Sequence, residues 1–177
     1  GVALWGTFEQ VSEDDFDWLL SINFHGVVNM TRAFLPLLKA SDDARLVNLS
    51  SIFGFISPAG QTAYSASKFA VRGFSDALRQ ELIGTNVGVS VVHPGGIATR
   101  IAEDARPADD LSQEAIKEEV AASRKILVMP PEQAAEIIIN GVEARKPRII
   151  VGNDAKIARF LLWLFPNSHL KIMDKLP

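Results

Sequence analysis

The segment VGVSVVHP (87–94) is almost entirely apolar, and it is the feature that most limits how this chain folds. A strand with one face in water alternates apolar and polar residues, whereas a strand of a parallel sheet, covered on both faces, is apolar nearly throughout. ARLVNLSS (44–51) also looks like a buried strand, and RIIVG (148–152) looks like a third. We therefore expect three buried parallel strands with helices on both faces of the sheet.

Helical patterns separate these three segments. Apolar residues recur every three to four positions over 12–40 and 62–83. Further helices are expected at 112–127, at 131–145 and in the apolar tail KIARFLLWLFPNSHLKIM. Ser12 with Asp15 predicts the start of the first helix. Because helices and strands alternate, the sequence predicts one α/β domain over residues 1–177.

The composition limits which partners, cellular compartment and metal sites are expected. Apolar residues make up 47% of the chain and charged residues 22%, which is typical of a globular protein. The net charge of −3 gives no reason to expect a nucleic-acid partner. The chain has no cysteine, which suits a reducing compartment, and we expect a cytoplasmic protein. The three histidines lack metal-ligand spacing, so no metal site is expected.

The count of strands and the first residues of the chain predict that more of the protein lies upstream. Three strands are few for a doubly covered parallel sheet, and no G-x-G-x-x-G turn is present. The sequence begins GVALWGTF, without an initiator methionine or a basic targeting segment. We expect an N-terminal βαβ portion upstream of Gly1, where any targeting signal would also lie.

AYSASKFA (63–70) places the only tyrosine of the chain, Tyr64, four residues before Lys68. On a helix these side chains are neighbours, with Cβ atoms about 5–6 Å apart. An ammonium at that range favours the phenolate and is expected to lower the phenol pKa, giving a general acid/base. Alone, the pattern more often reflects a half-buried tyrosine beside a solvated lysine.

Three further signals accompany this pair. Ser51 ends a strand, where α/β folds place their ligands, although SSIFG is also a plausible turn. Asn23 interrupts the apolar stripe of the first helix, and a buried amide needs a partner, in the simplest case a neighbouring backbone group loosened by Gly26. HPGGIAT (93–99) either exposes backbone amides to a phosphate or carboxamide or forms an ordinary strand-ending turn.

Together these residues resemble the short-chain dehydrogenase/reductase family, in its single-domain branch. Four blocks carry the resemblance in order and spacing: the segment from Gly1 to Leu38, LVNLSSIFG, AYSASKFAVRGFSDALRQEL and VSVVHPGGIATR. The resemblance covers the C-terminal two-thirds of such a protein and implies a Rossmann-type doubly wound parallel sheet. It places the glycine-rich nucleotide motif, and the residue that selects NAD or NADP, in the part before Gly1.

The resemblance also implies roles by position. Tyr64 is similar to the catalytic acid/base, and Lys68 to the lysine that lowers its pKa and holds the nicotinamide ribose. Ser51 is similar to the serine that orients the substrate carbonyl, and Asn23 to the asparagine that holds a relay water. The expected cofactor is NAD or NADP, with contacts from Gly1, Tyr64, Lys68, Pro94, Gly95, Ile97 and Thr99.

The implied activity interconverts an alcohol with a ketone or an aldehyde, and the apolar tail favours an uncharged, hydrophobic substrate. The helices at 13–39 and 62–83 resemble those through which the family forms homodimers or homotetramers. The tail packs over the substrate pocket or a partner subunit in the favoured interpretation, and lies on a membrane surface in the other. The alternatives for function are a catalytically silent dinucleotide-binding protein, an inactive fragment and an acyl-thioester ketoreductase.

Overall fold

The computed structural model describes residues 1–173 and contains the three expected parallel strands. The sheet has the order β2-β3-β5, formed by β2 (Ala44–Leu49), β3 (Val87–Pro94) and β5 (Arg148–Val151). Ala44 pairs with Val87, and Val91 pairs with Arg148. The central strand β3 therefore begins and ends where its apolar run does, and the parallel sheet is confirmed.

The helices also follow the sequence pattern. They are α1 (Glu13–Leu20), α2 (Gly26–Ala40), α3 (Thr62–Glu81), α4 (Gln113–Ile126), α5 (Pro131–Glu143), α6 (Asn153–Leu164) and α7 (His169–Met173). Ser12 caps α1, because its hydroxyl accepts a hydrogen bond from the Asp15 amide at 3.1 Å. The single helix expected over 12–40 is interrupted, since a π-helical turn at Ser21–His25 joins α1 to α2.

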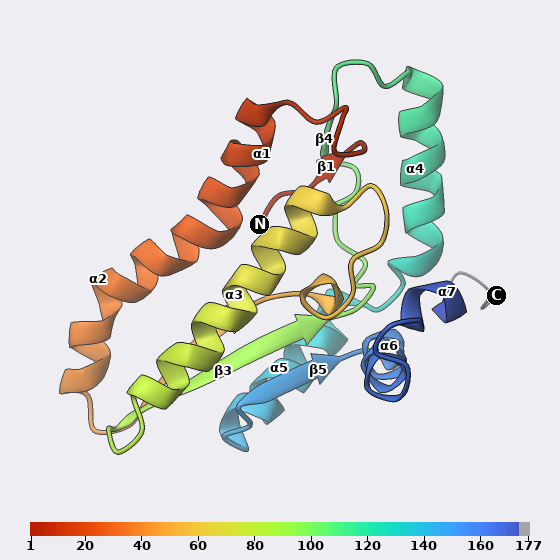
Figure 1. The fold of residues 1–177 in the computed structure, drawn as a ribbon. Helices are drawn as coiled ribbons and strands as arrows, with labels where there is room; N and C mark the ends of the chain where they lie inside the picture. Colours follow the sequence, from red (N-terminus) through yellow and green to blue (C-terminus); the bar gives the residue numbers. More distant parts are fainter. Residues whose placement is uncertain (174–177) are drawn as a thin grey trace.

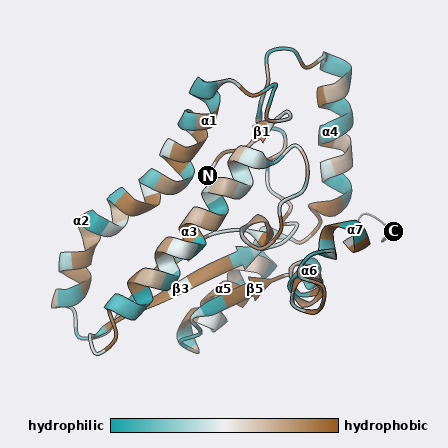
Figure 2. Cartoon of the chain, in the orientation of Figure 1, coloured by the Kyte–Doolittle hydropathy of each residue, from teal (hydrophilic) through white to brown (hydrophobic). Residues whose placement is uncertain are grey.

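Helices cover both faces of the sheet. In Figure 1, α1, α2 and α3 lie on one side of the strands and α5 lies on the other. Val87 and Val89 pack against Leu78 and Leu82 at the end of α3. Val92 points the other way and packs against Ala134 of α5. The hydrophobic colour along β3 in Figure 2 follows from burial on both faces.

A short two-stranded element, absent from the sequence-based expectation, ties the start of the chain to the loop after β3. β1 (Leu4–Trp5) pairs in parallel with β4 (Arg106–Pro107). The Arg106 guanidinium stacks on the Trp18 ring, 3.7 Å from its centroid, and forms an ion pair with Asp15. Because strands of two residues carry almost no sequence pattern, this contact is visible only in three dimensions.

Within the described part of the chain, no helix is both long enough and apolar enough to cross a membrane.

Candidate active site

The candidate site lies at the carboxyl end of β2 and the first turns of α3. Ser51 follows β2 and caps the short 3₁₀ turn Ile52–Gly54, while Tyr64 and Lys68 project from α3. Asn23 reaches the same region from the π-helical turn. Segments separated by up to 45 residues thus converge at the sheet edge where parallel α/β folds bind ligands.

Tyr64 and Lys68 are neighbours, as the four-residue spacing predicts. The Lys68 ammonium lies over the phenol ring, 5.4 Å from its centroid. The expected decrease of the Tyr64 pKa is wrong for this structure: burial raises that pKa, and a hydrogen bond with the Ser51 hydroxyl opposes the rise only partly. Desolvation of the phenolate outweighs the stabilisation by nearby groups, so Tyr64 keeps its proton at neutral pH.

Lys68 is held inside this site. Its side chain is buried, and burial lowers its pKa from 10.5 to about 8. Its ammonium donates a hydrogen bond to the Leu49 carbonyl at 3.3 Å. An ammonium has three N–H donors. Among residues 1–173 only Leu49 accepts one, which leaves two donors for a bound molecule.

Ser51 is held from three directions. Its hydroxyl accepts a hydrogen bond from the Phe53 amide at 3.2 Å and lies beside the Tyr64 phenol. Its carbonyl accepts a hydrogen bond from His93 Nδ1 at 2.9 Å. The preceding residue, Ser50, donates from its hydroxyl to the Lys68 carbonyl at 2.8 Å. The end of β2 is thereby fixed to both β3 and α3.

His93 is a supporting residue that the sequence did not single out. It is fully buried and stacks on Phe55, with ring centroids 3.9 Å apart. Burial lowers its pKa to about 4, so the ring is neutral at neutral pH. Because the Ser51 carbonyl only accepts, Nδ1 carries the hydrogen. No sequence signal gave this role, since the contact spans 42 residues.

Asn23 uses its carboxamide to hold the start of the chain. Its Oδ1 accepts from the Val2 amide at 2.8 Å, and its Nδ2 donates to the Val2 carbonyl at 2.9 Å and to Ser67 Oγ at 3.3 Å. The backbone partner of the simplest interpretation therefore exists, but it lies 21 residues away rather than next to Asn23. Both N–H groups are occupied, and one lone pair of Oδ1 remains.

The loop after β3 corrects the expectation of exposed backbone amides. The amides of Gly95, Gly96 and Ala98 donate to Val151 O, Asp154 Oδ2 and Met129 O, at 2.8, 2.6 and 2.8 Å. The amides of Ile97 and Thr99 donate to carbonyls two residues earlier, at 3.1 and 2.8 Å. All five are paired, so none is free for a phosphate.

Asp154 of α6 is a further residue that sequence reasoning missed. Its carboxylate fills the space beside Gly95, where an added Cβ would lie 2.1 Å from Oδ2, and it accepts the bond from the Gly96 amide. The only sequence signal for this contact was the acidic residue two positions after Gly152.

Replacing Gly96 with alanine is expected to destabilise the fold. An added Cβ would lie 1.9 Å from the Ile126 carbonyl oxygen, which is backbone and cannot rotate away. Overpacking of this kind costs about 1–3 kcal/mol. Gly73→Ala is the matched control, because Gly73 is exposed inside α3 with no atom within 4 Å, and alanine there should stabilise by up to about 1 kcal/mol.

Thermal melts of both variants followed by circular dichroism would test this. A lower Tm for Gly96→Ala beside an unchanged or higher Tm for Gly73→Ala is the expected result, and equal melts would contradict the close packing.

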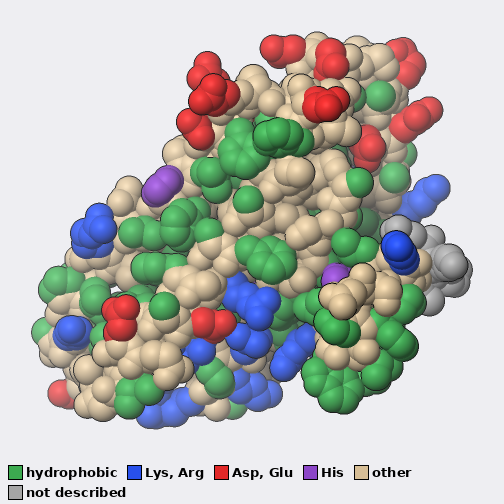
Figure 3. All heavy atoms as spheres, viewed as in Figure 1, with side chains coloured by type: hydrophobic (Ala, Val, Ile, Leu, Met, Phe, Trp, Pro, Cys, Tyr) green, Lys and Arg blue, Asp and Glu red, His purple; other side chains and the backbone are tan. Residues whose placement is uncertain are grey.

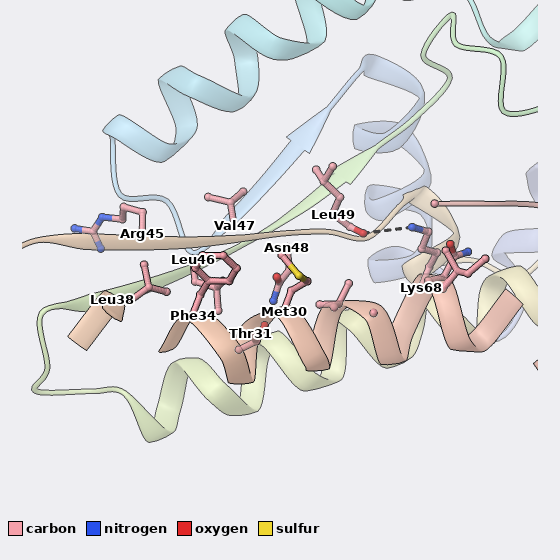
Figure 4. Close-up of a pocket in the computed structure, with 15 residues that line it drawn as sticks. Met30, Thr31, Phe34, Leu38, Arg45, Leu46, Val47, Asn48, Leu49 and Lys68 are labelled. Atoms are coloured by element: carbon pink, nitrogen blue, oxygen red, sulfur yellow. Dashed lines mark hydrogen bonds between the residues drawn. The ribbon is translucent and has the colours of Figure 1, made fainter. Parts of the chain in front are cut away.

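A groove of about 530 Å³ opens beside Lys68. Its walls are apolar side chains of α2 and β2, such as Met30, Phe34 and Leu46, and Lys68 lies at one end (Figure 4). Asn23 lines the same groove. Gly1 lies in the same corner, since an added Cβ would be 3.0 Å from Asn23 Oδ1 and 3.4 Å from Lys68 Nζ. Tyr64 and Ser51 do not line this groove.

The site residues predicted from the sequence therefore form two separate groups in the structure. Tyr64, Lys68 and Ser51 form a connected cluster, and Gly1 and Asn23 join it at Lys68. Pro94, Gly95, Ile97 and Thr99 form a separate loop held against α6 and the α4–α5 connection. Among the residues described, no group of three acidic or histidine side chains is arranged to hold a metal ion.

Comparison with known proteins decides the family. The profile of the short chain dehydrogenases matches residues 1–110, which include Asn23, Ser51, Tyr64 and Lys68. The chain belongs to the short-chain dehydrogenase/reductase family. A protein of Mycobacterium tuberculosis strain H37Rv, named as the oxidoreductase SadH, is 41% identical over 175 residues. That match covers 98% of this chain and 63% of the relative.

Solved structures of short-chain dehydrogenases share the fold. The enzyme of Burkholderia phymatum, in complex with NAD, is 23% identical with a TM-score of 0.79, over 100% of this chain and 65% of that one. The enzyme of Burkholderia cenocepacia, in complex with NADP, is 21% identical with a TM-score of 0.76, over 100% and 67%. The chain thus spans 63% of the SadH relative and 65% and 67% of these two solved chains.

Proposed function

We propose that the protein containing this chain is an NAD(P)-dependent oxidoreductase that interconverts an alcohol with a ketone or an aldehyde. The Ser51 hydroxyl beside the Tyr64 phenol, with the buried Lys68 ammonium over the same ring, carries the proposal. Membership in a family of oxidoreductases supports it. We assign the proton transfer to these three side chains.

Tyr64 transfers the proton at the substrate oxygen. Because burial raises its pKa, the phenol is protonated at neutral pH and is ready to donate to a carbonyl oxygen. Ser51 donates a second hydrogen bond to that oxygen and polarises the carbonyl. The bonds from His93 and Ser50 hold the end of β2 in place, so that both hydroxyls meet the same atom.

Lys68 fits the ribose of a nicotinamide dinucleotide. Two of its N–H donors have no acceptor among residues 1–173, and ribose hydroxyls accept such bonds. When bound, the dinucleotide supplies or accepts the hydride. Gly1 and Tyr64 would lie beside it, and we keep Pro94, Gly95, Ile97 and Thr99 as contacts through side chains and carbonyls, since their amides are paired. Asn23 positions the Lys68 corner by holding Val2.

The substrate and the assembly complete the proposal. An uncharged, hydrophobic alcohol or carbonyl compound suits the apolar surroundings of Tyr64, where Phe53 packs edge-on with ring centroids 5.9 Å apart. A homodimer or homotetramer in the cytoplasm is proposed through α2 and α3. Leu37 on α2 is exposed by 66% and does not line the groove beside Lys68.

The product of the complete reading frame that contains residues 1–177 is the protein to assay. Titration with NADH and NADPH measures binding, and a panel of alcohols, ketones, aldehydes and an acyl-thioester ketone measures turnover. Turnover on the uncharged compounds is the expected result. Nucleotide binding without any turnover would instead identify a silent binding protein, and turnover on the thioester alone would identify an acyl-thioester ketoreductase.

A further inference from the structure

Helix α6 presents an apolar outer face that no described residue covers. Its exposed side chains, here called the α6 ridge, have exposed fractions between 39% for Phe165 and 75% for Trp163, and they are Ile157, Phe160, Trp163, Leu164 and Phe165. The inner face is packed: Ala155 and Ala158 are fully buried, and Ala158 contacts the cluster of Phe55 and Ile56. Helix α6 is therefore packed on the domain through its inner face, and the ridge lies on its outer face.

Cations border the ridge. Lys156 and Arg159 stand one turn before Phe160 and Trp163 on the same helix, and these four side chains line one hollow with Ile150 of β5. Apolar and basic groups thus share a single surface rather than lying on opposite sides of the molecule. This combination is typical of helices that lie in a membrane interface.

A second group of cations lies next to the first. Arg72, Arg79 and Arg148 surround one carboxylate, Asp76, at 3.8, 2.7 and 2.7 Å. Three guanidinium groups against one carboxylate leave an excess of positive charge. In Figure 3, Lys and Arg side chains gather beside the hydrophobic atoms over α6, whereas Asp and Glu gather at the opposite end of the molecule.

We propose that the α6 ridge docks on an anionic lipid bilayer. The apolar side chains enter the boundary between headgroups and acyl chains, with Trp163 at the interface, where tryptophan is enriched. Lys156, Arg159 and the arginines around Asp76 face the lipid phosphates. At 12 residues α6 is too short to span the bilayer, so it lies along the surface.

The charge pattern favours a lipid surface over a second copy of the chain. In a two-fold symmetric dimer each copy presents the same patch, so the cations bordering one ridge would approach those of the other. Like charges facing each other oppose association. An anionic surface instead neutralises every cation around the ridge at once, and the acidic end of the molecule points away from it.

Co-sedimentation with vesicles tests the proposal on the product of the complete reading frame. The protein should pellet with vesicles of phosphatidylcholine and phosphatidylserine, much less with phosphatidylcholine alone, and less as salt is raised. Lys156→Gln with Arg159→Gln should weaken binding about 30-fold, because each cation near the surface contributes about 1 kcal/mol. Phe160→Ser with Trp163→Ser should abolish binding.

Phe8→Ser with Ile83→Ser is the matched control, because these side chains are 67% and 72% exposed on other elements, and it should bind like the wild type. Circular dichroism melts establish that each variant folds. Absence of binding by the wild type, or equal binding by the ridge variant, overturns the proposal. Light scattering tests whether a second copy of the chain covers the ridge instead. If the wild type is a dimer that does not bind vesicles, and Phe160→Ser with Trp163→Ser makes it a monomer, a second copy occupies the ridge and the proposal is overturned.

Discussion

Tyr64→Phe is expected to lower kcat by about 10²–10⁴-fold in the product of the complete reading frame, which is the usual contribution of a positioned acid/base. The substitution removes one hydroxyl and keeps the ring, so the edge-on packing against Phe53 and the place of Lys68 over the ring remain. The affinity for NADH or NADPH should change little, because the ammonium of Lys68 and its bond to Leu49 are untouched.

Steady-state kinetics with the best carbonyl compound of the panel, together with a nucleotide titration, would measure both quantities. Phe69→Leu is the control on the same helix: Phe69 is exposed by 38% and belongs to neither group of site residues, so kcat should stay near wild type. Retention of most of the turnover in Tyr64→Phe would remove Tyr64 from the proton transfer.

Lys68→Met is expected to have two opposite effects, loss of turnover and a gain in stability at neutral pH. The turnover falls because the two free N–H donors disappear from the nucleotide side of the site. The fold becomes more stable because methionine fills the buried position without an ammonium that must be desolvated. An active-site residue that destabilises its own fold is the expected trade-off between stability and function.

The pH dependence follows from the lowered pKa of Lys68. Its folded-state pKa of about 8 lies below the ordinary value of 10.5. Below pH 8 the ammonium is charged in both states, and its burial disfavours the folded state by about 3 kcal/mol. Between pH 8 and 10.5 the folded state releases the proton first, so stability is regained as pH rises.

Denaturant unfolding of Lys68→Met and wild type at pH 7 and pH 10 would measure this difference. Allowing about 1 kcal/mol for the lost bond to Leu49, the variant should be about 2 kcal/mol more stable at pH 7, and its advantage should shrink at pH 10. Lys125→Met serves as the control, because Lys125 is exposed and surface substitutions change stability by less than about 0.5 kcal/mol. A pH-independent difference for Lys68→Met would contradict the buried ammonium.

Two expectations from the sequence were partly wrong because they considered only residues close together in the chain. The spacing of Tyr64 and Lys68 correctly made them neighbours, but the sign of the Tyr64 pKa shift depends on burial, which the surrounding chain supplies. The glycines after β3 correctly marked a tight turn, but their amides are taken by Val151, Asp154 and Met129. Both errors concern groups whose partners come from distant segments.

The sequence by itself determined the three parallel strands, most helix boundaries and the family, because apolar periodicity, caps and motif spacing are properties of neighbouring residues. Only the tertiary structure decided that Asn23 holds Val2, that His93 holds Ser51 and that Arg148 meets Asp76. These contacts join residues far apart in the chain. The energy of a hydrogen bond or of a desolvated charge depends on which groups lie next to each other in space, and the order of residues in the sequence does not show this.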